Sequence, residues 1–208
     1  MKLLVAGGDA IVRKGVREII RARPGWDVSA EARDLAELVD ALRGNAADAV
    51  VLELPLGATS DVDVIAEVRR EAPVTPLLIL ASYPEEHYGL AFLRAGANGY
   101  VRRSAEPDEF LAAVANVAKG GNYVSAALSR KIAQSMVRGE PTQPHERLSA
   151  RELEVFHLLA IGRSPTEIAG MLQLSVKTVS TYRTRILEKT GFRSNADIVG
   201  YAIRNRLV

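Results

Sequence analysis

The chain of 208 residues is long enough for two small domains, and its 48% hydrophobic and 25% charged residues are typical of a folded protein, which excludes intrinsic disorder. It has no cysteine, which excludes disulfides and thiolate metal sites, and no apolar run approaches the roughly 18 residues that span a bilayer, so we expect a cytoplasmic protein with neither signal peptide nor membrane anchor. Within the formal net charge of +2, residues 145–208 hold 10 Lys and Arg against 6 Asp and Glu (+4) and residues 1–144 hold 17 against 19 (−2), which suits a C-terminal region that meets a phosphate backbone but is also within ordinary fluctuation.

The first 120 residues alternate short β-branched runs with patterns whose apolar residues recur at spacings of three and four, which predicts five strand-helix units. The predicted strands are Lys2–Ala6, Asp27–Ala30, Asp48–Glu53, Leu77–Ala81 and Asn98–Val101, and the predicted helices are Ala10–Ala22, Leu35–Arg43, Val62–Glu71, Glu86–Ala95 and Pro107–Lys119. The third and fourth strands are apolar on both faces, as strands covered by helices on each side must be. We therefore expect an α/β domain with a doubly wound, five-stranded parallel sheet over residues 1–121, with any site at the carboxyl ends of its strands.

Residues 122–147 are predicted to be a linker region, with one helix over Ala126–Val137 and a polar stretch with two prolines over residues 139–144. The pattern of residues 148–208 is wholly helical. The predicted helices are Ala150–Ile161, Pro165–Gln173, a third that Ser175 caps and that runs to Thr190, and Ala196–Asn205. This predicts a second, all-α domain of four helices.

The second and third helices of this domain are separated by only two residues, as in a helix-turn-helix. On the third helix, Val179, Tyr182, Ile186 and Leu187 form one apolar stripe, which leaves a polar, mildly basic face outward. Such a face suits the major groove of DNA, where hydroxyl groups reach base edges and cations bind phosphates. From the charged face alone, a solvated helix in a small bundle is the favoured interpretation.

Four segments decide between these readings: residues 148–155 (LSARELEV), 167–169 (EIA), 174–179 (LSVKTV) and 186–191 (ILEKTG). Together they resemble the LuxR/NarL class of helix-turn-helix domains. The resemblance implies that Ser180, Thr181 and Thr184 face the groove and that Lys177, Thr178, Tyr182, Arg185 and Lys189 lie near the DNA backbone. The helical wheel agrees for all but Tyr182, which falls in the apolar stripe. The resemblance also implies that the last helix pairs two copies through Ile198, Val199 and Ala202, for which core packing is an equal alternative.

The N-terminal domain resembles the receiver domain of two-component response regulators, through residues 4–6 (LVA), 49–52 (AVVL), 94–100 (RAGANGY) and 120–123 (GGNY). The whole chain thus resembles a response regulator of the NarL/FixJ type. The resemblance places two metal-binding acids, a phosphorylated aspartate, a Ser or Thr, and a lysine at five positions. Here these positions hold Gly7, Gly8, Glu53, Ala81 and Arg103.

These replacements remove the chemistry of phosphoryl transfer. Glycine supplies no oxygen to Mg²⁺, alanine has no hydroxyl, and an arginine opposite Glu53 favours a permanent ion pair. We expect no cofactor, no metal and no enzymatic activity, and the three histidines are too scattered to form a catalytic or metal site. Glu53 either mimics a phosphorylated aspartate or only satisfies Arg103.

The sequence therefore predicts a transcription regulator that binds double-stranded DNA as a homodimer, independently of phosphorylation. The alternative is an interaction module that pairs with another response regulator and changes the DNA binding of that partner. A third hypothesis is a sensor that binds a small molecule in the vacated acidic pocket. No specific feature of the sequence supports this hypothesis.

Overall fold

The computed structural model describes residues 1–44, 47–56, 61–83, 85–138, 143–205 and 207–208. The chain forms two compact units, Met1–Ser129 and Arg130–Val208, divided within helix α6 (Ala126–Arg138). Within the described residues, no helix is both long and apolar enough to cross a membrane. The predicted linker residues 139–142 lie outside the described part of the chain.

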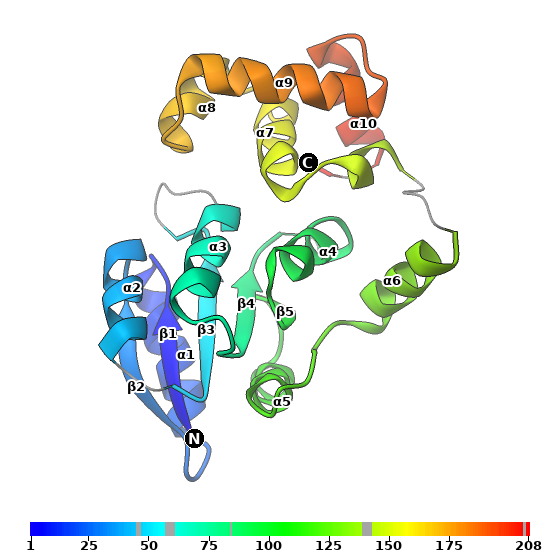
Figure 1. Ribbon diagram of the computed structural model, residues 1–208. Coiled ribbons are helices and arrows are strands. Elements are labelled where there is room, and N and C mark those ends of the chain that lie inside the picture. Colours follow the sequence, from blue (N-terminus) through cyan, green and yellow to red (C-terminus); the bar gives the residue numbers. More distant parts are fainter. Residues whose placement is uncertain (45–46, 57–60, 84, 139–142, 206) are drawn as a thin grey trace. The chain divides into compact units, whose positions relative to one another are not determined.

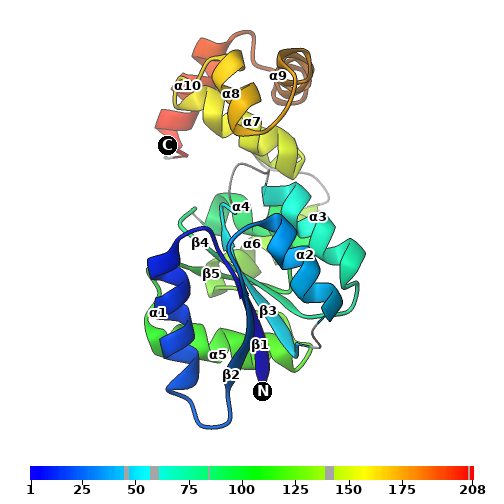
Figure 2. The same ribbon diagram turned by 90° about the vertical axis from the view of Figure 1, so that its left-hand side faces the viewer.

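The first unit contains one parallel sheet of five strands in the order β2-β1-β3-β4-β5. The strands are β1 (Lys2–Ala6), β2 (Asp27–Ala32), β3 (Ala49–Leu54), β4 (Leu77–Ala81) and β5 (Gly99–Arg102). The helices are α1 (Ala10–Arg21), α2 (Leu35–Gly44), α3 (Asp61–Glu71), α4 (Glu85–Ala95) and α5 (Pro107–Ala118). In Figure 2, α1 and α5 cover one face of the sheet and α2, α3 and α4 the other. The predicted doubly wound α/β fold is confirmed.

The central strands lie fully inside this unit, because every residue of β3 and β4 is buried. Their register pairs Leu54 with Ala81, and β1 pairs Ala6 with Leu52. The carboxyl ends of these three strands therefore meet at one edge of the sheet. That edge brings the loop after β1, Glu53 and the end of β4 together.

The segment after α5 packs on the first unit rather than serving only as a spacer. The Tyr123 backbone forms a parallel bridge with Gly99, where an added Cβ would lie 2.8 Å from the Tyr123 carbonyl oxygen. Ser125 donates its backbone N–H to Glu85 over 2.9 Å, and the buried Leu128 lies against Gly89 of α4. Part of the predicted linker region 122–147 therefore covers the outer edge of the sheet.

After the end of α6, the described residues of the second unit form the short helix η1 (Pro144–Arg147) and four α-helices, α7 (Ala150–Ala160), α8 (Pro165–Met171), α9 (Val176–Thr190) and α10 (Asn195–Arg204). Serines begin all four α-helices: Ser149, Ser164 and Ser194 form capping boxes, and Ser175 accepts from the Thr178 backbone N–H. Gly191 ends α9 in the left-handed conformation. Figure 1 shows α9 lying across α7 and α8, and the predicted all-α helix-turn-helix arrangement is confirmed.

His145, in the last part of the predicted linker, is a core residue of this unit. Its ring is 1% exposed, and its Nδ1 lies 2.8 Å from the Tyr201 hydroxyl of α10. The packed core of the second unit thus includes residues before Leu148, the predicted start of the domain.

Candidate nucleic-acid interface and carboxylate pocket

Helix α9 has one buried and one exposed face. Val179 and Ile186 are fully buried, while Tyr182 and Leu187 of the predicted apolar stripe are half-buried. The exposed face carries the residues predicted to meet DNA: Lys177, Ser180, Thr181, Thr184 and Arg185. Along the helix axis, the three hydroxyl groups of this face lie between two cations, Lys177 toward the start of α9 and Arg185 further along it.

The three hydroxyl groups of this face share one bonding pattern. Ser180, Thr181 and Thr184 each donate to the backbone carbonyl four residues earlier, over 3.0, 3.0 and 3.1 Å. The hydroxyl proton is thereby engaged within the helix, and the oxygen lone pairs stay available as acceptors. The face thus offers acceptors and threonine methyl groups to a ligand.

Three other predicted DNA contacts are partly engaged within the unit. Thr178 is half-buried, and its hydroxyl lies 2.8 Å from that of the helix cap Ser175. Tyr182 is half-buried, so its ring packs while part of it faces solvent. Lys189 donates to the carboxylate of Glu152 over 2.7 Å.

The Lys189–Glu152 ion pair joins α9 to the start of α7. Glu152 is 3% exposed and also accepts the backbone N–H of Ser149 over 2.8 Å. Burial raises the pKa of this carboxyl, but Lys189 and Ser149 outweigh burial, so the pKa lies below its ordinary value. Lys189 therefore holds α9 in place.

Sequence reasoning also missed two arginines that hold the helices together. Arg183 of α9 donates to the Asn195 side chain at the start of α10 over 2.6 Å. Arg151 of α7, 8% exposed, bonds to Glu154 and to the carbonyl of Leu172 at the end of α8. Only the pairing of Arg151 with Glu154, three residues apart on one helix, leaves a signal in the sequence.

The residues of α10 expected to pair two copies do not all lie on its outward face. Ile198 and Ala202 are both 0% exposed inside the second unit, so they have no surface to offer to a second copy; Val199 is half-buried. Ile198 and Ala202 therefore pack in the core of this unit, which was the other alternative for these residues. The outward stripe of α10 is Ala196, Val199, Gly200 and Ile203, spaced at three and four residues, with Ile203 62% exposed.

In the first unit, the carboxyl ends of the strands bring together Gly7, Gly8, Glu53, Ala81 and Arg103, a group we call the carboxylate pocket. Glu53, at the end of β3, is 4% exposed, and its Oε1 accepts from Arg103 Nη1 over 3.2 Å. Its Oε2 makes no hydrogen bond with the described residues. A Cβ added at Gly7 would lie 2.3 Å from that Oε2. The carboxylate thus fills the volume that a side chain at position 7 would need.

The remaining groups at this edge take structural roles. Ala81 is buried, its carbonyl accepts from the Arg103 backbone N–H over 2.9 Å, and the neighbouring Ser82 is exposed. Asp9, the first acid after β1, caps α1 by accepting from the Ile11 and Val12 backbone N–H groups. An Asp just before a helical pattern is a recognisable cap, a signal that the sequence analysis left unused.

The pocket does not fit a divalent cation. Burial raises the pKa of Glu53, and the hydrogen bond and charge of Arg103 offset this only in part, so the pKa remains above its ordinary value. Mg²⁺ needs several oxygen ligands, but Glu53 is already paired with Arg103, and the nearby Asp9 carboxylate caps α1. Among the described residues, no three His, Cys, Asp or Glu side chains are grouped to hold a metal ion.

Comparisons with known proteins match both units. A family model described as "Response regulator receiver domain" matches residues 3–115, and one described as "Bacterial regulatory proteins, luxR family" matches residues 146–202. The oxygen regulatory protein NreC of Staphylococcus aureus is 32% identical, over 100% of this chain and 99% of NreC. The solved structure of the RcsB response regulator of Salmonella typhimurium is 25% identical with a TM-score of 0.73, over 97% of this chain and 96% of RcsB. A LuxR-family two-component response regulator from Aurantimonas sp. is 29% identical with a TM-score of 0.60, over 65% of this chain.

Proposed function

This chain belongs to the DNA-binding response regulators of the luxR family, and from this premise we propose that it regulates transcription without being phosphorylated. Membership supplies the general activity, which is DNA binding by the second unit. The proposal concerns the first unit and whether its receiver-like pocket is phosphorylated. No enzymatic step is part of the proposal.

The observation that carries the proposal is the Glu53–Arg103 ion pair above Gly7. An ordinary receiver needs a metal ion to neutralise the charge that develops on the phosphoryl oxygens. Here Arg103 Nη1 already lies 3.2 Å from the carboxylate, and that carboxylate occupies the space beside Gly7. In a phosphorylated receiver, a phosphoryl group supplies the negative charge of this pocket and a lysine supplies the positive charge. Here the side chains of Glu53 and Arg103 supply both charges without any modification.

This proposal is tested by labelling with acetyl phosphate and Mg²⁺, followed by intact-protein mass spectrometry. We expect no phosphoryl adduct on the wild type or on Glu53→Asp, because the aspartate alone restores neither the metal ligands nor the hydroxyl at Ala81. A receiver with all five ordinary residues, treated in parallel, must gain the adduct. Stoichiometric phosphorylation of the wild type or of Glu53→Asp would contradict the proposal.

For the second unit, we propose that α9 reads the major groove. The engaged hydroxyl protons leave Thr181 and Thr184 as acceptors, which suits the amino groups of adenine and cytosine, and their methyl groups suit the methyl of thymine. Lys177 and Arg185 are exposed on this face, and their charges suit phosphate contacts. Thr178, Tyr182 and Lys189 keep a supporting role, because their side chains are partly engaged within the unit.

We further propose that two copies meet on DNA through the outward stripe of α10. Ala196 and Gly200 let two helices approach closely, and Val199 and Ile203 supply apolar surface. A two-fold contact uses the same patch twice, and two reading helices then address half-sites about one helical turn apart. The alternative partner, another response regulator, would be indicated by a purified chain that binds no duplex until that regulator is added.

A further inference from the structure

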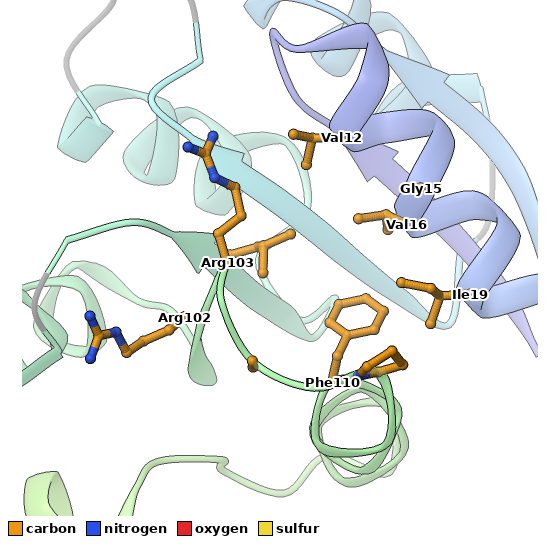
Figure 3. Close-up of a pocket in the computed structure, with 10 residues that line it drawn as sticks. Val12, Gly15, Val16, Ile19, Arg102, Arg103 and Phe110 are labelled. Carbon is orange, nitrogen blue, oxygen red and sulfur yellow. The ribbon is translucent and has the colours of Figure 1, made fainter.

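A cavity of about 210 Å³ lies between α1 and α5 of the first unit, on the side of the sheet that these helices cover (Figure 3). Val12, Val16 and Ile19 of α1 line one wall, spaced at three and four residues. Phe110 of α5 faces them in Figure 3, and Leu80 of β4 also lines the cavity. An engineered apolar cavity of about 150 Å³ in another protein binds benzene, so this one has room for a single aromatic ring with a short substituent.

Gly15, in the middle of α1, keeps the wall of the cavity open. A glycine in a helix interior costs roughly 0.5–1 kcal/mol relative to alanine. Neither tight packing nor a positive φ requires glycine here, since an added Cβ would meet nothing within 4 Å. Gly15 lines the cavity, so its missing side chain is space that a ligand can use.

A single cation marks one end of the cavity among the side chains drawn in Figure 3. In Figure 3 the Arg103 side chain extends toward the end of the cavity where Val12 lies, whereas Arg102 points away. Arg103 uses one donor on Glu53 and is 44% exposed, and a guanidinium has five N–H donors. None of the described residues that line the cavity is acidic. The lining therefore suits an apolar body with one negative charge and disfavours a cation.

We propose that this cavity binds a small aromatic monocarboxylate, with the ring between α1 and Phe110 and the carboxylate on Arg103. The ligand would act on the same guanidinium that pairs with Glu53, so it would bias the ion pair of the carboxylate pocket. The lining of the cavity carries this proposal, and it does not require the proposed absence of phosphorylation. The signal received by this unit would then be an aromatic carboxylate and not a phosphoryl group.

The test is a titration of the full ¹⁵N-labelled chain with sodium phenylacetate at constant ionic strength, followed by amide chemical shifts. We expect saturable shifts at Val12, Gly15, Val16 and Phe110, and at least tenfold weaker binding of 2-phenylethanol, which has the same ring without the charge. Absence of saturable shifts at these residues, or equal affinity for the alcohol, would overturn the proposal.

Two variants and a control identify the site. Gly15→Leu fills the cavity and should abolish phenylacetate binding, whereas Gly15→Ala adds one methyl group and should change the dissociation constant less than about threefold. Both replace glycine by better helix formers, so we expect both to fold. Arg103→Gln should weaken phenylacetate at least tenfold and leave the alcohol unchanged. Wild-type affinity for phenylacetate in Gly15→Leu would show that the cavity is not a ligand site.

Discussion

Replacing Arg103 by glutamine should make the stability of the first unit depend strongly on pH. At 3.2 Å the gross attraction between Arg103 and Glu53 is about 1 kcal/mol in water and about 5 kcal/mol at an effective dielectric constant of about 20. Arg103 is 44% exposed and Glu53 only 6%, so solvent screens the pair in part. We expect Arg103→Gln to cost about 1–3 kcal/mol at pH 7.

An upper limit follows from protonation of Glu53. Its pKa in the folded chain is already raised by burial, and without Arg103 it rises further. From the ordinary value of 4.5, protonating the carboxyl costs about 3.4 kcal/mol at pH 7 and about 0.7 kcal/mol at pH 5, at about 1.36 kcal/mol per unit. Because the folded pKa lies above the unfolded one, stability is fully present below the unfolded pKa and is lost as the pH rises through the folded pKa. The loss should therefore shrink below about 1 kcal/mol at pH 5.

The assay is urea unfolding of the full chain followed by tryptophan fluorescence at both pH values. Trp26 is the single tryptophan of the sequence and packs against the core of the first unit, so its emission reports that unit alone. The matched control is Glu53→Gln with Arg103→Gln, which removes the buried charge at position 53 and should show the same loss at both pH values. An Arg103→Gln loss as large at pH 5 as at pH 7 would refute the reasoning.

Three further predictions concern the second unit. Thr181→Ala or Thr184→Ala should cost about 1–3 kcal/mol on the preferred duplex and relax its sequence preference, whereas Lys177→Ala or Arg185→Ala should weaken all duplexes and lower the salt slope by about one; unchanged binding in all four, measured by fluorescence anisotropy, would mean that α9 is not the reader. Ile203→Glu should abolish two-copy binding in analytical ultracentrifugation on a duplex with two half-sites, while Arg204→Glu, one residue along the same helix, should retain a dimer; dimers in both would exclude the outward stripe of α10. Tyr201→Phe leaves the buried His145 Nδ1 without the hydroxyl at 2.8 Å and should cost about 1–3 kcal/mol in a thermal melt followed by circular dichroism; an unchanged melt would show that this bond is not needed.

Most of the fold follows from local signals in the sequence. The central strands are apolar on both faces, so burial within a parallel sheet is their only stable environment. The start of α7 is fixed by the capping box of Ser149 and Glu152, which lie only three residues apart. These features depend on residues within a few positions of one another.

The parts that the sequence did not predict depend on contacts between distant residues. α10 is apolar on two sides, and periodicity alone does not say that Ile198 faces the core and Ile203 the solvent. The Lys189–Glu152 pair spans 37 residues and becomes apparent only when α9 lies beside α7. The five positions of the carboxylate pocket came from a family pattern, but the close approach of Glu53 to Gly7 required the coordinates.

The most direct test of the central claim is the affinity of the wild-type chain for its preferred duplex, measured with Mg²⁺ before and after incubation with acetyl phosphate. The same samples are examined by intact-protein mass spectrometry. We predict dissociation constants that agree within twofold and no phosphoryl adduct, since the Glu53–Arg103 pair needs neither metal nor phosphate. An adduct of one phosphoryl group per chain together with a tenfold or greater gain in affinity would contradict the account.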